Sequence, residues 1–243
     1  MSRVLSLWAR WIESACERLN IPFSVGLFLV LLPLIIVPIF GVLILVPATR
    51  GVGLLLLQEN NVVETSTFML LLTAGLYGMH QTWTARSSGH STLVGVFLGV
   101  FSLGLLFVAM EEIAWGQQFL HFNTPEIINR RNLQGELTLH NIKGLQGNSE
   151  IFRLIFGIGG LVGVAVRRFP RLQPISVDPL LLPFLLVITA VSAVDTYNDL
   201  YSLGENIDTG VQRMSELVEM LIGCAALAYV VSIARRQKTA IKS

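Results

Sequence analysis

Six long apolar runs, separated by short polar segments, dominate the pattern of hydrophobic and polar positions along this chain. Each run approaches the roughly 20 apolar residues that a helix needs to cross a bilayer. Because lipid offers the backbone no partners, a spanning segment must satisfy its hydrogen bonds internally, which favours helices. The runs cover residues 23–46, 65–83, 92–110, 151–166, 179–198 and 214–233. The pattern predicts an all-α polytopic membrane helix bundle of about six transmembrane helices, forming a single integral membrane domain over residues 1–243.

The fourth and fifth spans are shorter than a bilayer requires, and the last two spans reach the lengths given above only by including polar residues. Residues 151–166 and 179–194 hold only 16 positions each, and one end of each is fixed by the arginines at 167 and 168 and by the Asp-Pro pair at 178 and 179. The missing length must come from the opposite end, which brings Asp195 and Asn198 into the fifth span. The same argument brings Glu216 and Glu219 into the sixth. Ionisable groups at such depth usually face a bundle interior or a cavity.

The segment before the first span, residues 1–20, places apolar side chains at helical spacing with charged side chains between them. This pattern predicts an amphipathic helix that lies on the membrane surface. A cleaved signal peptide is the competing interpretation. The apolar run that follows has 24 residues, whereas the apolar region of a signal peptide has about 7–15. We therefore expect the segment to be retained.

Composition agrees with a membrane protein, since the mean hydropathy is +0.65 and only 14% of the residues are charged. The net charge of +1 hides an asymmetry between the two sides of the predicted membrane. With the N-terminus in the cytoplasm, 11 of the 17 basic residues fall on the cytoplasmic side, whereas 13 of the 16 acidic residues fall outside or at the outer helix ends. The positive-inside rule therefore predicts that both termini are cytoplasmic. We expect the protein in a bacterial inner (plasma) membrane, in contact with the lipid bilayer.

A polar outer loop is predicted over residues 111–150, after the third span. If that helix continues past Met110, then Glu112, Trp115 and Gln118 follow at three-residue intervals and Glu111 precedes Trp115 by four. These side chains would form one polar stripe. The run Thr-Pro-Glu at 124–126 reads as an N-cap, a proline at the first helical position and an acid in the first turn. It predicts a short helix over residues 125–131.

Glu136 and His140 stand four residues apart farther along this loop, so a helix there would place them on one face. Such a pair is often a simple salt bridge, but carboxylate and imidazole together also suit zinc, iron or manganese. With Glu112 they form a candidate ligand set for a divalent metal such as zinc. Alternatively the same groups act as general acid and base.

The candidate site joins this loop to the polar ends of the last two spans. The catalytic candidates are Glu112, Glu136, His140, Asp195 and Glu219. The candidates for binding a substrate are Glu111, Trp115, Gln118, Asn141, Asn198 and Glu216.

Other chemistries find little support. The chain has no Gly-x-Ser-x-Gly elbow, no Cys-x-x-Cys pair and no His-Glu-x-x-His run. Cys16 and Cys224 are not expected to meet, and His80, His90 and His121 are interpreted as interfacial residues. Without a basic folded domain, nucleic-acid binding is not expected. Glycines in the third and fourth spans, at 95, 99, 157, 159, 160 and 163, are interpreted as helix-packing positions.

The run Glu111-Glu112-Ile113-Ala114-Trp115-Gly116-Gln117, followed by Thr124-Pro125-Glu126 and by Asn132-Leu133-Gln134-Gly135-Glu136 with His140-Asn141, resembles the signature of a group of uncharacterised prokaryotic multi-pass membrane proteins. The resemblance implies the topology and the importance of these residues, but no particular activity. The adjacent glutamates are also similar, more coarsely, to the pair in intramembrane proteases related to the CAAX-processing enzymes. A similar coarse likeness connects the site to the alkaline-ceramidase-like hydrolases, which bind zinc.

These observations predict a multi-pass membrane protein with an acidic Glu/His/Asp cavity at the extracytoplasmic boundary. The leading hypothesis is a hydrolase or transferase that acts on a lipid or lipid-linked substrate. The alternatives are a transporter or ion-binding protein, in which the same acids line a pathway, and a non-catalytic assembly or sensor module.

Overall fold

The computed structural model describes residues 2–58, 61–87, 92–120, 122–129, 137–138 and 149–242. Every regular element within these residues is helical, as the apolar pattern predicts. The elements are α1 (Ser2–Leu19), α2 (Phe23–Leu45), α3 (Pro47–Leu56), α4 (Val62–Ser87), α5 (Thr92–Glu112), η1 (Ala114–Gly116), α6 (Gln117–Leu120), α7 (Glu126–Asn129), α8 (Ser149–Ala165), η2 (Val166–Arg168), η3 (Gln173–Ile175), η4 (Pro179–Leu181), α9 (Leu182–Tyr201) and α10 (Glu205–Lys242).

Six of the described helical segments are long and apolar enough to cross a membrane. They are Phe23–Leu45, Val62–Thr84, Thr92–Glu112, Ser149–Arg168, Gln173–Tyr201 and Ile207–Lys238. All six correspond to the runs that the sequence predicts. The chain is therefore a multi-pass membrane protein with an all-α fold.

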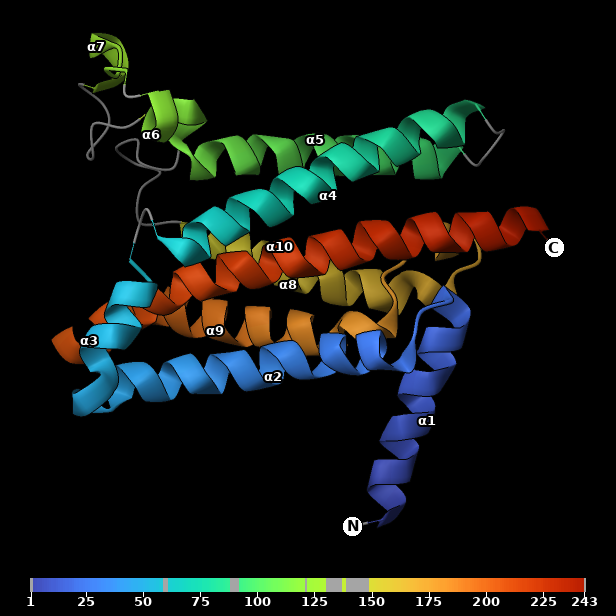
Figure 1. The fold of residues 1–243 in the computed structure, drawn as a ribbon, viewed down its shortest axis with the longest axis horizontal. Helices are drawn as coiled ribbons and strands as arrows, with labels where there is room; N and C mark the ends of the chain where they lie inside the picture. The colour runs from blue at the N-terminus through green and yellow to red at the C-terminus, as the bar shows by residue number, and fades with distance from the viewer. Residues whose placement is uncertain are drawn as a thin grey trace.

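The spans lie side by side, and α10 runs through the middle of the bundle (Figure 1). α10 contacts α4 on one side and α9, α8 and α2 on the other. The largest buried cluster surrounds α10, with Leu221 and Ile233 packed among Phe184 and Ile188 of α9 and Leu98 of α5. Because other helices surround α10, Glu219 in its first half is held against the neighbouring spans, whereas Lys238 near its end is exposed.

The two ends of the bundle differ in charge. The acidic end is the end where α5 finishes and α8 and α10 begin, and it lies at the left of Figure 1. It carries Glu112, Arg153, Asp195 and Glu219. We call the basic end the opposite one, where α8 and α10 finish, with Arg18, Arg167, Arg168, Arg171, Arg235, Arg236 and Lys238. This separation agrees with the asymmetry of charge along the sequence.

Short helices lie at the acidic end. α3 follows α2 immediately and packs back against it, with Gly53 close to the backbone of Leu43. Pro47 is the first residue of α3, where its missing N–H leaves no hydrogen bond unmade. α7 agrees with the short helix expected from Thr124-Pro125-Glu126 in the part that is described.

Glycines allow close approach between neighbouring spans, but not at every predicted position. A Cβ added to Gly157 of α8 would lie 2.4 Å from Oγ1 of Thr189 on α9, and Gly160 is equally close to Leu185. Gly95 and Gly159, in contrast, have open space around the same position, so interpreting them as packing residues is wrong. Between α4 and α5 the closest glycine is Gly78, against Ser102. The contacts depend on which face of the helix each glycine occupies, and the spacing of small residues alone does not define that face.

The α8–α9 interface gives a prediction with an internal control. Gly157→Leu is expected to lower the free energy of unfolding by about 1–3 kcal/mol, because the larger side chain overpacks the contact with Thr189. Gly159→Leu, two residues away on an open face, should change it by about 0.5 kcal/mol or less. Titration of both variants with sodium dodecyl sulfate in mixed micelles measures the difference. Equal losses would show that α8 and α9 do not approach each other at Gly157.

Candidate functional site at the acidic end

Arg153 of α8 is the centre of the charged groups at the acidic end. Its Nη1 donates a hydrogen bond to Oε1 of Glu219 on α10 at 2.6 Å, and its Nη2 donates to Oδ2 of Asp195 on α9 at 2.8 Å. The Arg153 and Asp195 side chains are each only 7% exposed, and that of Glu219 is 26% exposed. Three spans are therefore joined through one guanidinium by charge-assisted hydrogen bonds, which are about twice as strong as neutral ones.

The start of α8 positions this guanidinium. Ser149 is one turn before Arg153, and its Oγ accepts a third hydrogen bond from Nη1 at 3.1 Å. Glu150 lies buried in the same first turn, where the positive end of the helix dipole stabilises a carboxylate. Nε of Arg153 is also buried, and no described residue accepts a hydrogen bond from it. The arginine is thus fixed in place by its Nη atoms while one donor is not matched within the described residues.

Glu112 extends the site to a fourth span. It is the last residue of α5, and it lies near enough to Glu219, Glu216 and Glu64 to be repelled by them and near enough to Arg153 to be attracted. The C-terminal end of a helix disfavours negative charge. The end of α5 and the neighbouring carboxylates therefore both disfavour a negative charge on Glu112.

The backbone turns sharply directly after Glu112. α5 does not continue as helix, because Ala114, Trp115 and Gly116 all have positive φ angles, of 45°, 55° and 88°. A continuous polar stripe through Gln118 is therefore wrong. The contact between Glu111 and Trp115 still forms, since indole Nε1 donates to Oε1 of Glu111 at 2.6 Å. This bond holds Trp115, whose ring is 40% exposed, beside Phe107 at the end of α5.

Gln117 organises the segment after this turn, although it was not among the predicted site residues. Its Nε2 donates to the carbonyl oxygen of Phe122 at 3.1 Å and to Oγ1 of Thr124 at 2.9 Å. Its Oε1 accepts a hydrogen bond from the backbone N–H of Leu137 at 2.7 Å. One amide therefore contacts three points of the following segment, the farthest of them 20 residues along the chain from Gln117.

Asn198 and Glu216 take different positions. Asn198 is buried near the end of α9, and its Oδ1 accepts a hydrogen bond from the N–H of Leu203 at 3.1 Å. Asp208 accepts from the same N–H and from Ser202, so these contacts close the turn into α10. Glu216 is half-buried on α10, among the neighbours of Glu112. Asn198 thus shapes the turn, whereas Glu216 belongs to the charged group.

Several predicted residues lie outside the description. Glu136, His140, Asn141, His90 and His121 are not among the described residues, and the side chain of Gln118 is not described. Within the described ranges no group of three or more His, Cys, Asp or Glu side chains is arranged to hold a metal ion. Two of the three proposed metal ligands, Glu136 and His140, lie outside those ranges.

The cysteines behave as expected from the sequence, because Cys16 and Cys224 are both free. Cys16 is buried against Gly26, where α1 meets α2, and burial raises the pKa of its thiol. A raised pKa leaves little of the reactive thiolate near neutral pH. Cys16 is therefore interpreted as a packing residue.

Arg153 is the residue that the sequence argument missed. Residues 151–166 form a mainly apolar run, and in the predicted topology Arg153 belongs to the outer basic residues, so the pattern does not pair this cation with the acids. An arginine inside a predicted span was the available signal, because such residues almost always pair with acids or face a cavity.

Comparisons with protein-family models, with curated proteins and with solved structures found no match for this chain. The functional argument therefore depends on the geometry of the acidic end.

Proposed function

We propose that this protein is a membrane-embedded hydrolase or transferase whose acidic end acts on a lipid or lipid-linked substrate. The observation that supports the proposal is the position of Glu112, beside three other carboxylates and at the helix end that disfavours negative charge. The cation in this group, Arg153, is already engaged by Asp195 and Glu219. Such an excess of carboxylates is stabilised by a proton or by positive or donor groups of a ligand.

The proposed roles follow from these contacts. Glu112 is the acid–base group, which accepts the proton of an attacking hydroxyl or water and returns it to the departing oxygen. Asp195 and Glu219 complete the catalytic group, and Arg153 holds them. Glu216 binds hydroxyl or ammonium donors of the substrate, and Trp115 offers its exposed ring to an apolar or sugar surface.

The other site residues predicted from the sequence keep in this proposal the roles that the sequence pattern indicates. Glu136 and His140 are the further acid–base candidates, and Glu111, Gln118, Asn141 and Asn198 are the further substrate contacts. In a metal-dependent form of the reaction, Glu112, Glu136 and His140 hold a divalent ion such as zinc. Metal analysis of the purified protein, with His140→Ala for comparison, separates the two forms, because only the metal-dependent one predicts that the variant loses bound metal.

The test of the proposed function uses the whole protein in nanodiscs that contain total bacterial membrane lipids. Mass spectrometry follows the lipid pool over time, with and without added lipid-linked sugars as donors. The proposal predicts a product that the wild-type protein forms and Glu112→Gln does not. A lipid pool that stays unchanged with every donor class contradicts it.

The proposed orientation places the acidic end outside and both termini in the cytoplasm. The basic end carries seven of the basic residues named above, and short loops rich in Lys and Arg stay on the cytoplasmic side. A C-terminal fusion to green fluorescent protein should therefore be fluorescent, and one to alkaline phosphatase inactive. The reverse pair of results would invert the orientation and place the site in the cytoplasm.

A proton- or ion-coupled transporter is the second candidate. Ser192 lies one turn before Asp195 on α9, is 1% exposed, and its hydroxyl has no partner among the described residues. This polar group extends the charged site toward the middle of the bundle. Flux of protons or sodium into proteoliposomes that disappears in Asp195→Asn, without any change in lipid, would favour transport over catalysis.

A further inference from the structure

The basic end lies at the depth of the lipid headgroups if the six spans cross the bilayer. Exposed aromatic side chains mark this depth, with Trp83 near the end of α4 80% exposed and Phe169 after η2 54% exposed. Tryptophan is enriched at the membrane–water boundary, and phenylalanine beside basic residues is typical of segments that lie in the interface. Phe169 stands between Arg168 and Arg171, so an apolar ring and two cations share one short connection.

α1 leaves the basic end across the direction of the spans (Figure 1). Its second half is packed onto the bundle, where Ile12, Ala15 and Leu19 lie in one buried cluster with Leu180. Its first half extends beyond the bundle, and Trp8 there is exposed. An amphipathic helix in this orientation lies in the plane of the headgroups.

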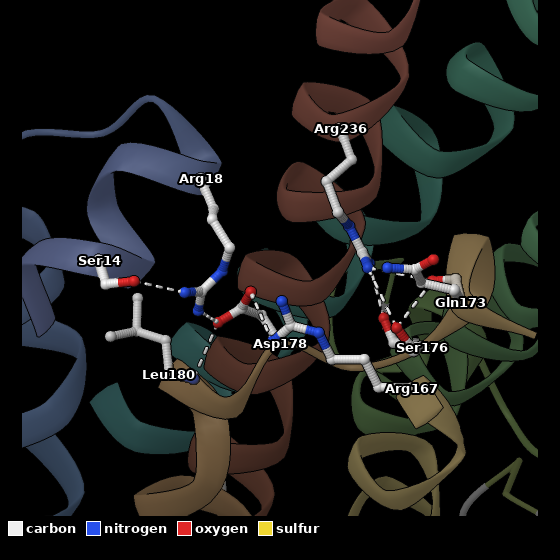
Figure 2. Close-up of polar contacts among 8 residues, drawn as sticks. All are labelled: Ser14, Arg18, Arg167, Gln173, Ser176, Asp178, Leu180 and Arg236. Carbon is white, nitrogen blue, oxygen red and sulfur yellow. Dashed lines mark hydrogen bonds and ion pairs between the residues drawn. The ribbon is translucent and has the colours of Figure 1, made fainter. Parts of the chain in front are cut away.

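Ion pairs to one buried carboxylate connect the helices at this end (Figure 2). Asp178 is buried between Arg18 of α1, at 3.6 Å, and Arg167 of η2, at 3.9 Å. Oδ1 of Asp178 also accepts a hydrogen bond from the N–H of Leu180 at 3.0 Å. α1, the end of α8 and the start of α9 are thereby joined at one carboxylate.

The end of α10 is fixed to the same region. Nη2 of Arg236 donates to the carbonyl oxygen of Ser176 at 2.6 Å, and Nη1 donates to Oγ of Ser176 at 3.2 Å. Arg235 donates to the carbonyl oxygen of Asn20, directly after α1. The connection between α8 and α9 is thus anchored to α1 and α10 by hydrogen bonds and ion pairs.

The basic end carries more positive than negative charge. With α1 included, the basic end has eight cationic side chains among the described residues, the seven named above and Arg10, whereas its acids are Glu13, Glu17 and Asp178. Arg168, Arg171 and Lys238 are exposed. Arg171 and Lys238 form no hydrogen bond or ion pair to any described residue. A basic surface at headgroup depth complements anionic lipids.

We propose that the basic end binds the headgroup of an anionic phospholipid, with Arg168, Arg171 and Lys238 contacting its phosphate and Phe169 inserted beside its acyl chains. The lipid belongs to the bilayer around the protein and is not a substrate of the acidic end. This site is independent of the proposed function. Each of the three cations contributes to binding through its charge. Removing two of them is therefore expected to weaken lipid binding roughly 30-fold.

Native mass spectrometry of the detergent-solubilised full chain, titrated with phosphatidylglycerol or phosphatidylcholine, tests the proposal. The wild-type protein should bind phosphatidylglycerol in preference to phosphatidylcholine. Arg168→Gln combined with Arg171→Gln should weaken phosphatidylglycerol binding roughly 30-fold. The matched control removes two cations from the acidic end, Arg50→Gln with Arg213→Gln, and should leave that affinity within about twofold of the wild-type value, because the site lies at the other end of the spans.

Three outcomes would overturn the site. Equal binding of the two lipids would remove the requirement for anionic charge, and an unchanged affinity in the Arg168/Arg171 variant would place the lipid elsewhere. Inorganic phosphate that binds as tightly as phosphatidylglycerol would show a free-anion site rather than a lipid site. Folding of each variant is checked by its elution as a single species, and the conservative pair Arg168→Lys with Arg171→Lys should keep most of the affinity.

Discussion

Replacing Arg153 with methionine is expected to lower the free energy of unfolding by about 3–5 kcal/mol, the largest effect on stability that we predict. The guanidinium is the partner of two carboxylates on two different spans, Asp195 and Glu219. Methionine fills much of the same volume but leaves both negative charges without a cation inside the bundle. Titration with sodium dodecyl sulfate in mixed micelles measures the loss.

A charge-neutral variant separates the role of charge from the role of volume. Arg153→Met combined with Asp195→Asn and Glu219→Gln removes all three charges together, and should recover stability to within about 1–2 kcal/mol of the wild-type value. Arg213→Met, which removes a cation from the same end of α10, should cost about 1 kcal/mol or less. If the triple variant is no more stable than Arg153→Met, the three residues do not form one ionic group.

Glu112→Gln should reduce the rate of the proposed lipid reaction by about 10²–10⁴-fold, the range that general acid–base groups contribute. The substitution keeps the shape of the side chain and removes its ability to exchange a proton. Because it also removes a negative charge from a repulsive group, the variant should be at least as stable as the wild-type protein. The measurement is the initial rate in nanodiscs, compared at equal amounts of folded protein.

The matched control for this prediction is Glu17→Gln, which makes the same chemical change on an exposed face of α1. It should leave the rate within about twofold. A rate in Glu112→Gln that equals the rate in the control would remove Glu112 from the chemistry and favour a structural or transport role for the acidic end.

The fold was largely predictable from the sequence because lipid imposes simple rules. A long apolar run has to become a helix, and all six runs did. The length argument was correct for the fifth span, since α9 continues through Asp195 and Asn198 to Tyr201. α3 was not predicted, because a proline and two glycines directly after an apolar run are also typical of a loop.

The site was predictable only in part, because its geometry depends on contacts between distant segments. Asp195 and Glu219 were identified by their depth, but their shared cation Arg153 precedes them by 42 and 66 residues. The turn after Glu112 was not predictable either, because alanine and tryptophan rarely adopt positive φ angles. The hydrogen bond from Trp115 to Glu111, which the four-residue spacing indicates, forms although the chain turns, so the spacing does not distinguish the turn from a continued helix.

The central claim of this account is that Glu112 shares one charged site with Arg153, Asp195 and Glu219. A double-mutant cycle of unfolding free energies, from Glu112→Gln, Glu219→Gln and the two combined, tests it most directly. The account predicts that the two substitutions are coupled by roughly 0.5–3 kcal/mol, because neutralising one carboxylate relieves the repulsion that the other experiences. Effects that add within about 0.3 kcal/mol would contradict it and would separate Glu112 from the ion pairs of Arg153.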